Sequence, residues 1–126
     1  MPNCRIISAP QVLQDGAHAF CFPQVDPVTL ANDVAVFFAQ QEYKFEGGHA
    51  LLSTWGQGSD TARMLLGGFV KRYQFTVAIE PQAATPYVWL RLAKGISGAM
   101  GGVLGYSKMN KEHARISAAL TQFFSG

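Results

Sequence analysis

The chain has 126 residues, of which 48% are apolar and 14% are charged, so it is expected to form one domain that folds without a disulfide or a metal. Its net charge of +2 combines −4 over residues 1–60, from six acids and two bases, with +6 over residues 61–126, from eight bases and two acids. No basic run exceeds two residues and no apolar run reaches ~18 residues, so nucleic acid is not indicated as a partner and a membrane-spanning helix is not expected.

The cysteines and histidines are spread along the chain. Cys4 and Cys21 form no CxxC pair, and His18, His49 and His113 have no second ligand at metal-binding spacing. This pattern predicts neither a metal site nor a cofactor. The N-terminal residues lack the long apolar core of a signal peptide. We therefore expect a soluble, cytoplasmic protein with reduced thiols.

The N-terminal half predicts a strand followed by a helix. Residues 17–23 (AHAFCFP) indicate a strand that ends at the proline. The clearest helix covers residues 26–41, because Asp26 can accept the free N–H groups of a first turn and Pro27 suits the first helical position. Its apolar stripe, which should pack on a sheet, consists of Leu30, Val34, Phe37 and Phe38.

The middle of the chain predicts three shorter elements. Residues 42–56 indicate two extended pieces on either side of a turn at Gly47-Gly48. Residues 59–68 indicate a short helix that stops at a second double glycine. The best strand is residues 72–80, in which apolar and polar side chains alternate.

The C-terminal part predicts a second hairpin strand and a long helix. Residues 87–93 alternate like the preceding strand and are close enough to pair with it. In residues 107–124 the apolar side chains recur at spacings of 4, 3, 4 and 3, which predicts an amphipathic helix, with Lys108 and Glu112 as a supporting pair on its exposed side. The whole chain, residues 1–126, is therefore expected to be a single α+β domain, with one antiparallel sheet of about four to six strands packed by two long helices and one short helix.

Five glycines lie between Lys94 and Lys108, in the segment KGISGAMGGVLGYSK. A glycine loop before a helix that is capped near Ser107 would aim free N–H groups at an anion. However, the segment does not match GxxxxGK[ST], and GxGxxG does not occur in the chain. The other interpretation, which we prefer, is that the glycines permit positive φ angles and a close approach to the sheet or to a second subunit.

The anion hypothesis predicts a ligand site at a basic, glycine-rich end of the fold. Arg63 and Lys71-Arg72 flank the second double glycine, and they would converge with Lys108 if both glycine segments lay at one end of the sheet. Trp55 can stack on a ligand, although an aromatic side chain in a small domain more often belongs to the core or to an interface. The complete candidate set is Arg63, Lys71, Arg72, Lys108, Gly101, Gly102, Ser107 and Trp55.

Two segments also carry a resemblance. LLGGFVKRY and SGAMGGVLGYSK, which has the form SGxxGGxxGxSK, make the chain similar to a family of small bacterial domains over roughly residues 43–116. The resemblance implies that the two glycine segments belong to one feature, and it carries over no catalytic residues.

Catalytic signatures are weak throughout. The chain has no GxSxG motif, and Cys21 is expected to be a small core residue. His113 lies on the apolar stripe of the last helix and is expected to be a hydrogen-bonded core histidine rather than a base. A small enzyme assembled from His49, Cys21 or Glu42 is the least favoured interpretation. We expect a non-enzymatic binding or regulatory module that binds an anionic or amphipathic ligand, such as a lipid, at the basic end. The alternative is a homo-oligomeric structural protein whose glycine-rich surface forms the subunit interface, without a small-molecule ligand.

Overall fold

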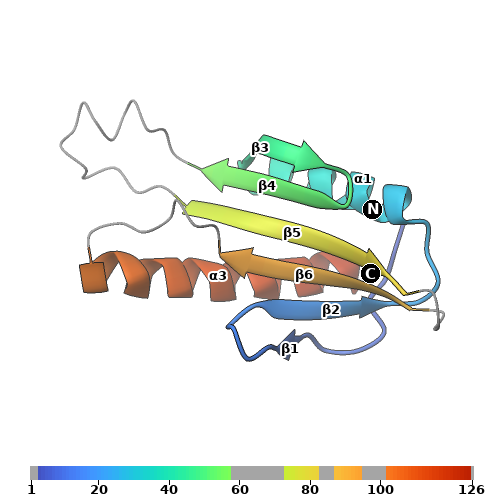
Figure 1. Cartoon of the computed structure of the whole chain (residues 1–126), viewed down its shortest axis with the longest axis horizontal. Helices are drawn as coiled ribbons and strands as arrows, with labels where there is room; N and C mark the ends of the chain where they lie inside the picture. Colours follow the sequence, from blue (N-terminus) through green and yellow to red (C-terminus); the bar gives the residue numbers. More distant parts are fainter. Residues whose placement is uncertain (1–2, 58–72, 83–86, 95–101, 126) are drawn as a thin grey trace.

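The structure, a computed structural model, describes the backbone of residues 3–57, 73–82, 87–94 and 102–125, and the side chains of these residues apart from 102–109. They form a six-stranded sheet with two helices on one of its faces (Figure 1). This confirms the predicted α+β class with a single antiparallel sheet.

The strand order of the sheet is β1-β2-β6-β5-β4-β3, and each neighbouring pair is antiparallel. The four strands from β3 to β6 each pair with their neighbour in sequence, whereas β2 pairs with β6 from the other end of the chain. The strands are β1 (Gln11–Val12), β2 (His18–Phe22), β3 (Lys44–His49), β4 (Leu52–Gln57), β5 (Tyr73–Pro81) and β6 (Val88–Lys94).

The two helices, α1 (Pro27–Gln40) and α3 (Gly102–Phe124), lie on the same side of the sheet (Figure 1). They meet through Phe37 and Phe123, whose ring centroids are 5.5 Å apart. The opposite face carries no helix in the part of the chain that the structure describes, and we call it the uncovered face. By strand register it holds Ala19, Cys21, Thr76, Ala78, Glu80, Trp89, Arg91 and Ala93.

The predicted set of two long helices and one short helix is not what the structure contains. Two helices are found in the described residues. The short helix predicted at residues 59–68 lies outside the described residues.

Helix α1 begins where its sequence predicts. Asp26 has extended backbone angles (φ −69°, ψ 123°), and its carboxylate accepts hydrogen bonds from the Val28 N–H at 3.3 Å and from the Thr29 hydroxyl at 3.2 Å. Pro27 follows at the first helical position, where its missing N–H has no intrahelical partner to lose. The predicted cap is confirmed.

The core lies between the sheet and both helices. The alternation predicted for the two central strands is confirmed, because the side chains of one face of β5 and β6 are buried. Apolar burial of this kind is the main stabilising contribution to a domain of this size. The largest fully buried side chains are Phe20, Phe22, Phe37, Phe38, Phe75, Phe124, Leu30, Leu90, Leu92, Ile116, Leu120 and Val34.

The turn predicted at Gly47-Gly48 is displaced. Both glycines lie within β3, and the turn is formed by Ala50 and Leu51. The pairing with β4 shifts between Phe45 and Gly47, so β3 contains a bulge. Gly48 has φ +100°, and a Cβ there would lie 2.1 Å from the carbonyl oxygen of Leu52. The double glycine therefore serves a bulged strand rather than a turn.

A buried carboxylate anchors the N-terminal segment. Asp33, on α1, is 4% exposed and accepts hydrogen bonds from the Asn3 N–H at 2.8 Å and from the Cys4 N–H at 3.0 Å. Burial, together with the Asp33 side chain, raises the pKa of the Cys4 thiol to about 12. Asp33 thus holds Cys4 in the core as an uncharged side chain. Both cysteines are free.

Candidate functional site

The residues that flank the two glycine-rich segments lie at one end of the sheet. Gln57, the last residue of β4, pairs with Tyr73, the first residue of β5. Phe75 pairs with Lys94, the last residue of β6. We call this the Lys94 end, defined by Gln57, Tyr73 and Lys94. The chain therefore leaves the sheet toward residues 58–72 and toward residues 95–101 from the same end.

Most of the predicted ligand-binding residues lie outside the part of the chain whose side chains the structure describes. Arg63, Lys71, Arg72 and Gly101 lie outside the described residues. Gly102, Ser107 and Lys108 belong to α3, in the part where only the backbone is described. The convergence of the basic side chains therefore stays a prediction.

The glycine loop predicted to extend to Ser107 ends earlier. Helix α3 begins at Gly102, so Gly105 is helical and Ser107 lies inside the helix rather than at its cap. A glycine within a helix costs only about 1 kcal/mol relative to alanine, which the packing of a long helix can offset. The free N–H groups of the first turn belong to residues 102–105. An anion bound at this helix terminus would therefore contact those residues.

Trp55 lies in the core. Its indole is 8% exposed and stacks on Phe38, with ring centroids 5.2 Å apart and planes 7° apart. The indole N–H donates to the Ser53 hydroxyl at 2.9 Å. Of the two interpretations for Trp55, the structure supports the core position.

A polar network crosses from α3 to the segment after α1. The Tyr43 hydroxyl donates to the Glu112 carboxylate at 2.6 Å, and the Arg115 guanidinium donates to the same carboxylate at 2.7 and 2.8 Å. Arg115 also reaches the side chain of Gln41 at 3.0 Å. Glu112 is buried, so its predicted position on the exposed side of the helix is wrong. The predicted pairing with Lys108 involves a side chain outside the described residues. Tyr43, which is buried and remote in sequence, determines where the Glu112 carboxylate points.

The pKa shifts in this network follow from burial and pairing. Burial raises the pKa of Glu112, but the hydrogen bonds from Arg115 and Tyr43 outweigh it, and the net direction is down. Burial and the Glu112 carboxylate raise the pKa of Tyr43. Glu112 is therefore a charged acceptor and Tyr43 a neutral donor at neutral pH. We interpret the network as structural, because the buried Tyr43 hydroxyl and the buried Glu112 carboxylate are hydrogen-bonded to each other.

Two histidines from distant parts of the chain meet between β2 and α3. The rings of His18 and His113 have centroids 4.3 Å apart. His18 Nδ1 lies 2.6 Å from the Ser117 hydroxyl, and His113 Nε2 lies 3.0 Å from the Leu92 carbonyl oxygen. Burial, and then the charge of Lys94, lower the pKa of His18. Ser117 is itself buried, so this arrangement does not present a nucleophile to a substrate.

His113 confirms the prediction of a hydrogen-bonded core histidine. It is 3% exposed, and burial lowers its pKa from 6.5 to about 4, although the hydrogen bond to Leu92 acts in the opposite direction. The unfolded chain takes up a proton on this ring near pH 6.5, whereas the folded protein does so only near pH 4. The contribution of His113 to the free energy of unfolding is therefore fully present above pH 6.5, and it is lost as the pH falls toward 4.

This shift predicts acid lability above the range in which carboxylates titrate. Between pH 7 and pH 5 the free energy of unfolding is expected to fall by about 2 kcal/mol through His113 alone. Urea unfolding at both pH values measures the difference. His113→Gln, which keeps a donor for the Leu92 carbonyl, is expected to remove most of this pH dependence. His49→Gln, at an exposed position, is expected to leave the pH dependence unchanged. Equal pH dependence in wild type and His113→Gln would contradict the assignment.

The residues of the least favoured enzymatic interpretation do not come together. Cys21 lies in β2, whereas His49 is the last residue of β3 and Glu42 precedes that strand, which is four strands away in the sheet order. Cys21 is 6% exposed, and burial raises the pKa of its thiol. A thiol of this kind is a poor nucleophile. Cys21 therefore behaves as the small buried residue that the sequence predicts.

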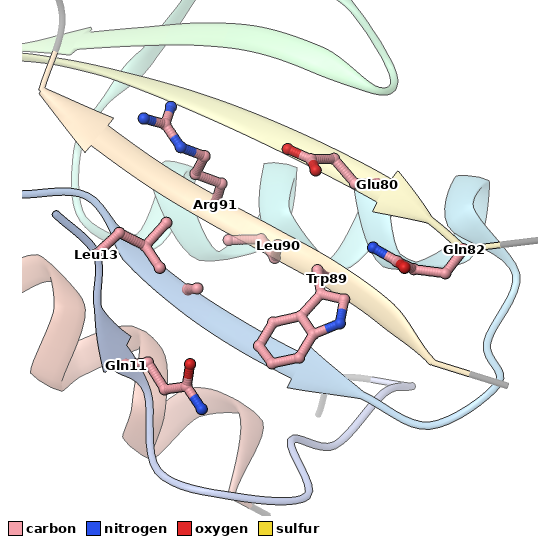
Figure 2. A pocket seen from close by; sticks show the side chains of 8 residues that line it. Gln11, Leu13, Glu80, Gln82, Trp89, Leu90 and Arg91 are labelled. Atoms are coloured by element: carbon pink, nitrogen blue, oxygen red, sulfur yellow. The ribbon is translucent and has the colours of Figure 1, made fainter. Parts of the chain in front are cut away.

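The uncovered face holds a pocket of about 250 Å³ beside Trp89. Figure 2 shows the indole of Trp89 between Gln11 and Leu13, on the side of β1, and Glu80 and Gln82, on the side of β5. The remaining lining residues are Ala19, Leu90 and Arg91.

The charged groups of the pocket differ in their pairing. Arg91 forms an ion pair with Asp15, from the turn between β1 and β2. Glu80 is exposed, and its carboxylate has no hydrogen bond or ion pair among the described residues. The carboxylate of Glu80 is therefore available to an incoming group, whereas the guanidinium of Arg91 is already matched.

Sequence patterns alone do not identify this pocket. The alternation of residues 87–93 puts Trp89 and Arg91 on one side of their strand, but the pocket also needs Gln11 and Leu13. Gln11 comes from β1, a strand of two residues in a segment without a clear pattern, and Leu13 directly follows that strand. The available signal was the predicted hairpin itself, in which Glu80 and Trp89 are direct cross-strand partners.

No protein-family model matches the chain, and no curated protein matches it. In the described part of the chain, no group of three or more histidine, cysteine or acidic side chains is placed to hold a metal ion. None of the helices in that part is both long and apolar enough to pass through a membrane.

Proposed function

We propose that the protein is a non-enzymatic binding module that takes an anionic or amphipathic ligand, such as a lipid head group, at the Lys94 end of the sheet. The observation that supports this proposal is the register of β4, β5 and β6. Because Gln57 pairs with Tyr73 and Phe75 pairs with Lys94, both glycine-rich segments are attached at the same end. That attachment is the condition under which their basic residues can act together.

The charge distribution supports an anionic partner at this end. Residues 61–126 carry eight of the ten basic residues. Arg63, Lys71 and Arg72 all belong to the segment between Gln57 and Tyr73, and the N-terminus of α3 adds the positive end of a helix dipole. Basic residues near an anionic membrane surface contribute about 1 kcal/mol each.

Vesicle binding tests the proposal. The probes are vesicles of phosphatidylcholine with and without phosphatidylglycerol, assayed by co-sedimentation. Wild type is expected to bind the anionic vesicles preferentially. The double variant Arg63→Ala/Arg72→Ala is expected to lose about 30-fold in affinity, because two basic residues are removed. The matched control is Arg5→Ala, an exposed arginine next to Ile6, whose N–H bonds to Phe124 at the far end of α3.

Two outcomes would overturn this proposal. One is equal binding to neutral and anionic vesicles. The other is an oligomer that binds neither kind of vesicle and that Gly102→Leu dissociates, as measured by light scattering. The second outcome would favour the alternative, a homo-oligomeric protein with a glycine-rich subunit interface.

A further inference from the structure

The pocket beside Trp89 is distant from the Lys94 end. Trp89 lies five residues before Lys94 in β6, which corresponds to about 17 Å along a strand. The two side chains also lie on opposite faces of the sheet, because five is an odd number of residues and successive side chains alternate. The pocket is thus independent of the ligand site proposed above.

The charge balance around the pocket favours a cation. Its one basic group, Arg91, is matched by Asp15, while the carboxylate of Glu80 has no partner among the residues that the structure describes. Glu80 lies directly opposite Trp89 in the pairing of β5 with β6. An anionic ligand would be repelled by Glu80 and would compete with Asp15 for Arg91. A cation would pair with the Glu80 carboxylate and would leave the ion pair between Arg91 and Asp15 intact.

The rest of the lining favours an organic cation over a metal ion. An indole attracts a cation at its face and suits alkylated ammonium groups, which are weakly hydrated. Leu13 and Ala19 add apolar surface, while Gln11 and Gln82 supply amide oxygens. A hard metal ion would need about six oxygen ligands, which these few polar groups do not supply. The pocket is several times larger than the ~30 Å³ of a water molecule in the liquid, so it has room for a head group.

From this combination we infer that the Trp89 pocket binds a small organic cation with an ammonium or guanidinium head group, which places its charge between Glu80 and the indole. The site would be a second one, opposite in charge preference to the Lys94 end. The chemistry is shared by free cations, such as quaternary amines, and by lysine or arginine side chains of a peptide.

The experiment follows the ¹H–¹⁵N spectrum of the whole protein during titration with choline. The indole N–H resonance of Trp89, assigned with Trp89→Phe, is expected to shift and saturate at millimolar concentrations. The neutral isostere 3,3-dimethylbutan-1-ol, which has the shape of choline without its charge, is expected to bind about tenfold more weakly. A parallel titration with an acetylated lysine amide distinguishes a free cation from a side chain, by which of the two binds more tightly.

The control variants separate charge from shape. Glu80→Gln is expected to reduce the affinity for choline about tenfold while leaving that for the isostere unchanged. Glu42→Gln, an exposed acid at a distant turn, is expected to leave both unchanged. Equal affinity for choline and the isostere, equal affinity of Glu80→Gln and wild type, or no saturable shift with any of the cations would each overturn the inference. None of these results depends on vesicle binding at the Lys94 end.

Discussion

Replacing Phe38 with alanine is expected to lower the free energy of unfolding by about 4 kcal/mol. The Phe38 ring is fully buried, stacks on Trp55 and makes an edge contact with Tyr43 at a centroid distance of 5.5 Å. Removing it leaves a cavity between α1 and β4, which the stiff neighbouring rings cannot fill. Urea unfolding followed by circular dichroism measures the loss, and Trp55 fluorescence is expected to shift to longer wavelength in the folded variant.

The matched control for Phe38 lies two residues earlier on the same helix. Val36 is 51% exposed, so Val36→Ala is expected to change stability by no more than about 0.5 kcal/mol. Similar losses in the two variants would show that the cost arises from the helix and not from the cavity. A loss below 1 kcal/mol in Phe38→Ala would contradict the stacking that joins α1 to the sheet.

Glu112→Ala is the second substitution with a large expected effect, a loss of about 3 kcal/mol in the free energy of unfolding. The substitution removes the acceptor for the buried Tyr43 hydroxyl and leaves it unsatisfied. Arg115 contributes less to the loss, because its side chain is 51% exposed and can return to water. Chemical denaturation at pH 7 measures the change.

A double variant tests the reason for this effect. Tyr43→Phe together with Glu112→Leu removes both the donor and the acceptor, and is expected to be more stable than Glu112→Ala alone. Arg115→Ala is expected to cost about 1 kcal/mol or less. If Arg115→Ala proved as destabilising as Glu112→Ala, the ion pair and not the Tyr43 hydroxyl would account for the loss.

The elements with a local physical cause could be predicted from the sequence. Asp26 and Pro27 specify the start of α1 through backbone groups only a few residues away. The alternation in β5 and β6 follows from having one face on the core. These features need no knowledge of distant contacts, and the α+β class follows from them.

Features that depend on distant partners could not be predicted. Glu112 looked exposed because its helical neighbours are polar, yet Tyr43, 69 residues away, makes it a buried acceptor. Gly47 and Gly48 looked like a turn because the bulge that they serve requires the pairing of β3 with β4. The sequence predicts too late a start for α3, because the glycines of residues 95–105 indicate a loop, although a long packed helix tolerates glycine.

The same distinction between local causes and distant partners applies to the candidate sites. That both glycine segments are attached at one end depends on the pairing of β4 with β5, which the sequence patterns do not determine. The Trp89 pocket is not recognisable in the sequence, because one of its walls includes β1, whose two residues carry no pattern of their own. An unpaired acid such as Glu80 is not distinguishable in sequence from a paired one.

The bulge in β3 has a consequence for behaviour at high concentration. In the described sheet, β3 and the two-residue β1 are the outermost strands, and neither offers a long, regular row of free N–H and C=O groups. Lys44 and the distorted backbone at Gly48 further disfavour docking of another strand at the β3 edge. Edge-to-edge pairing between the sheets of two molecules, which is the arrangement found in fibrils, is therefore disfavoured. Self-association of this protein is accordingly expected to use the face or the ends of the sheet, with each molecule keeping its fold.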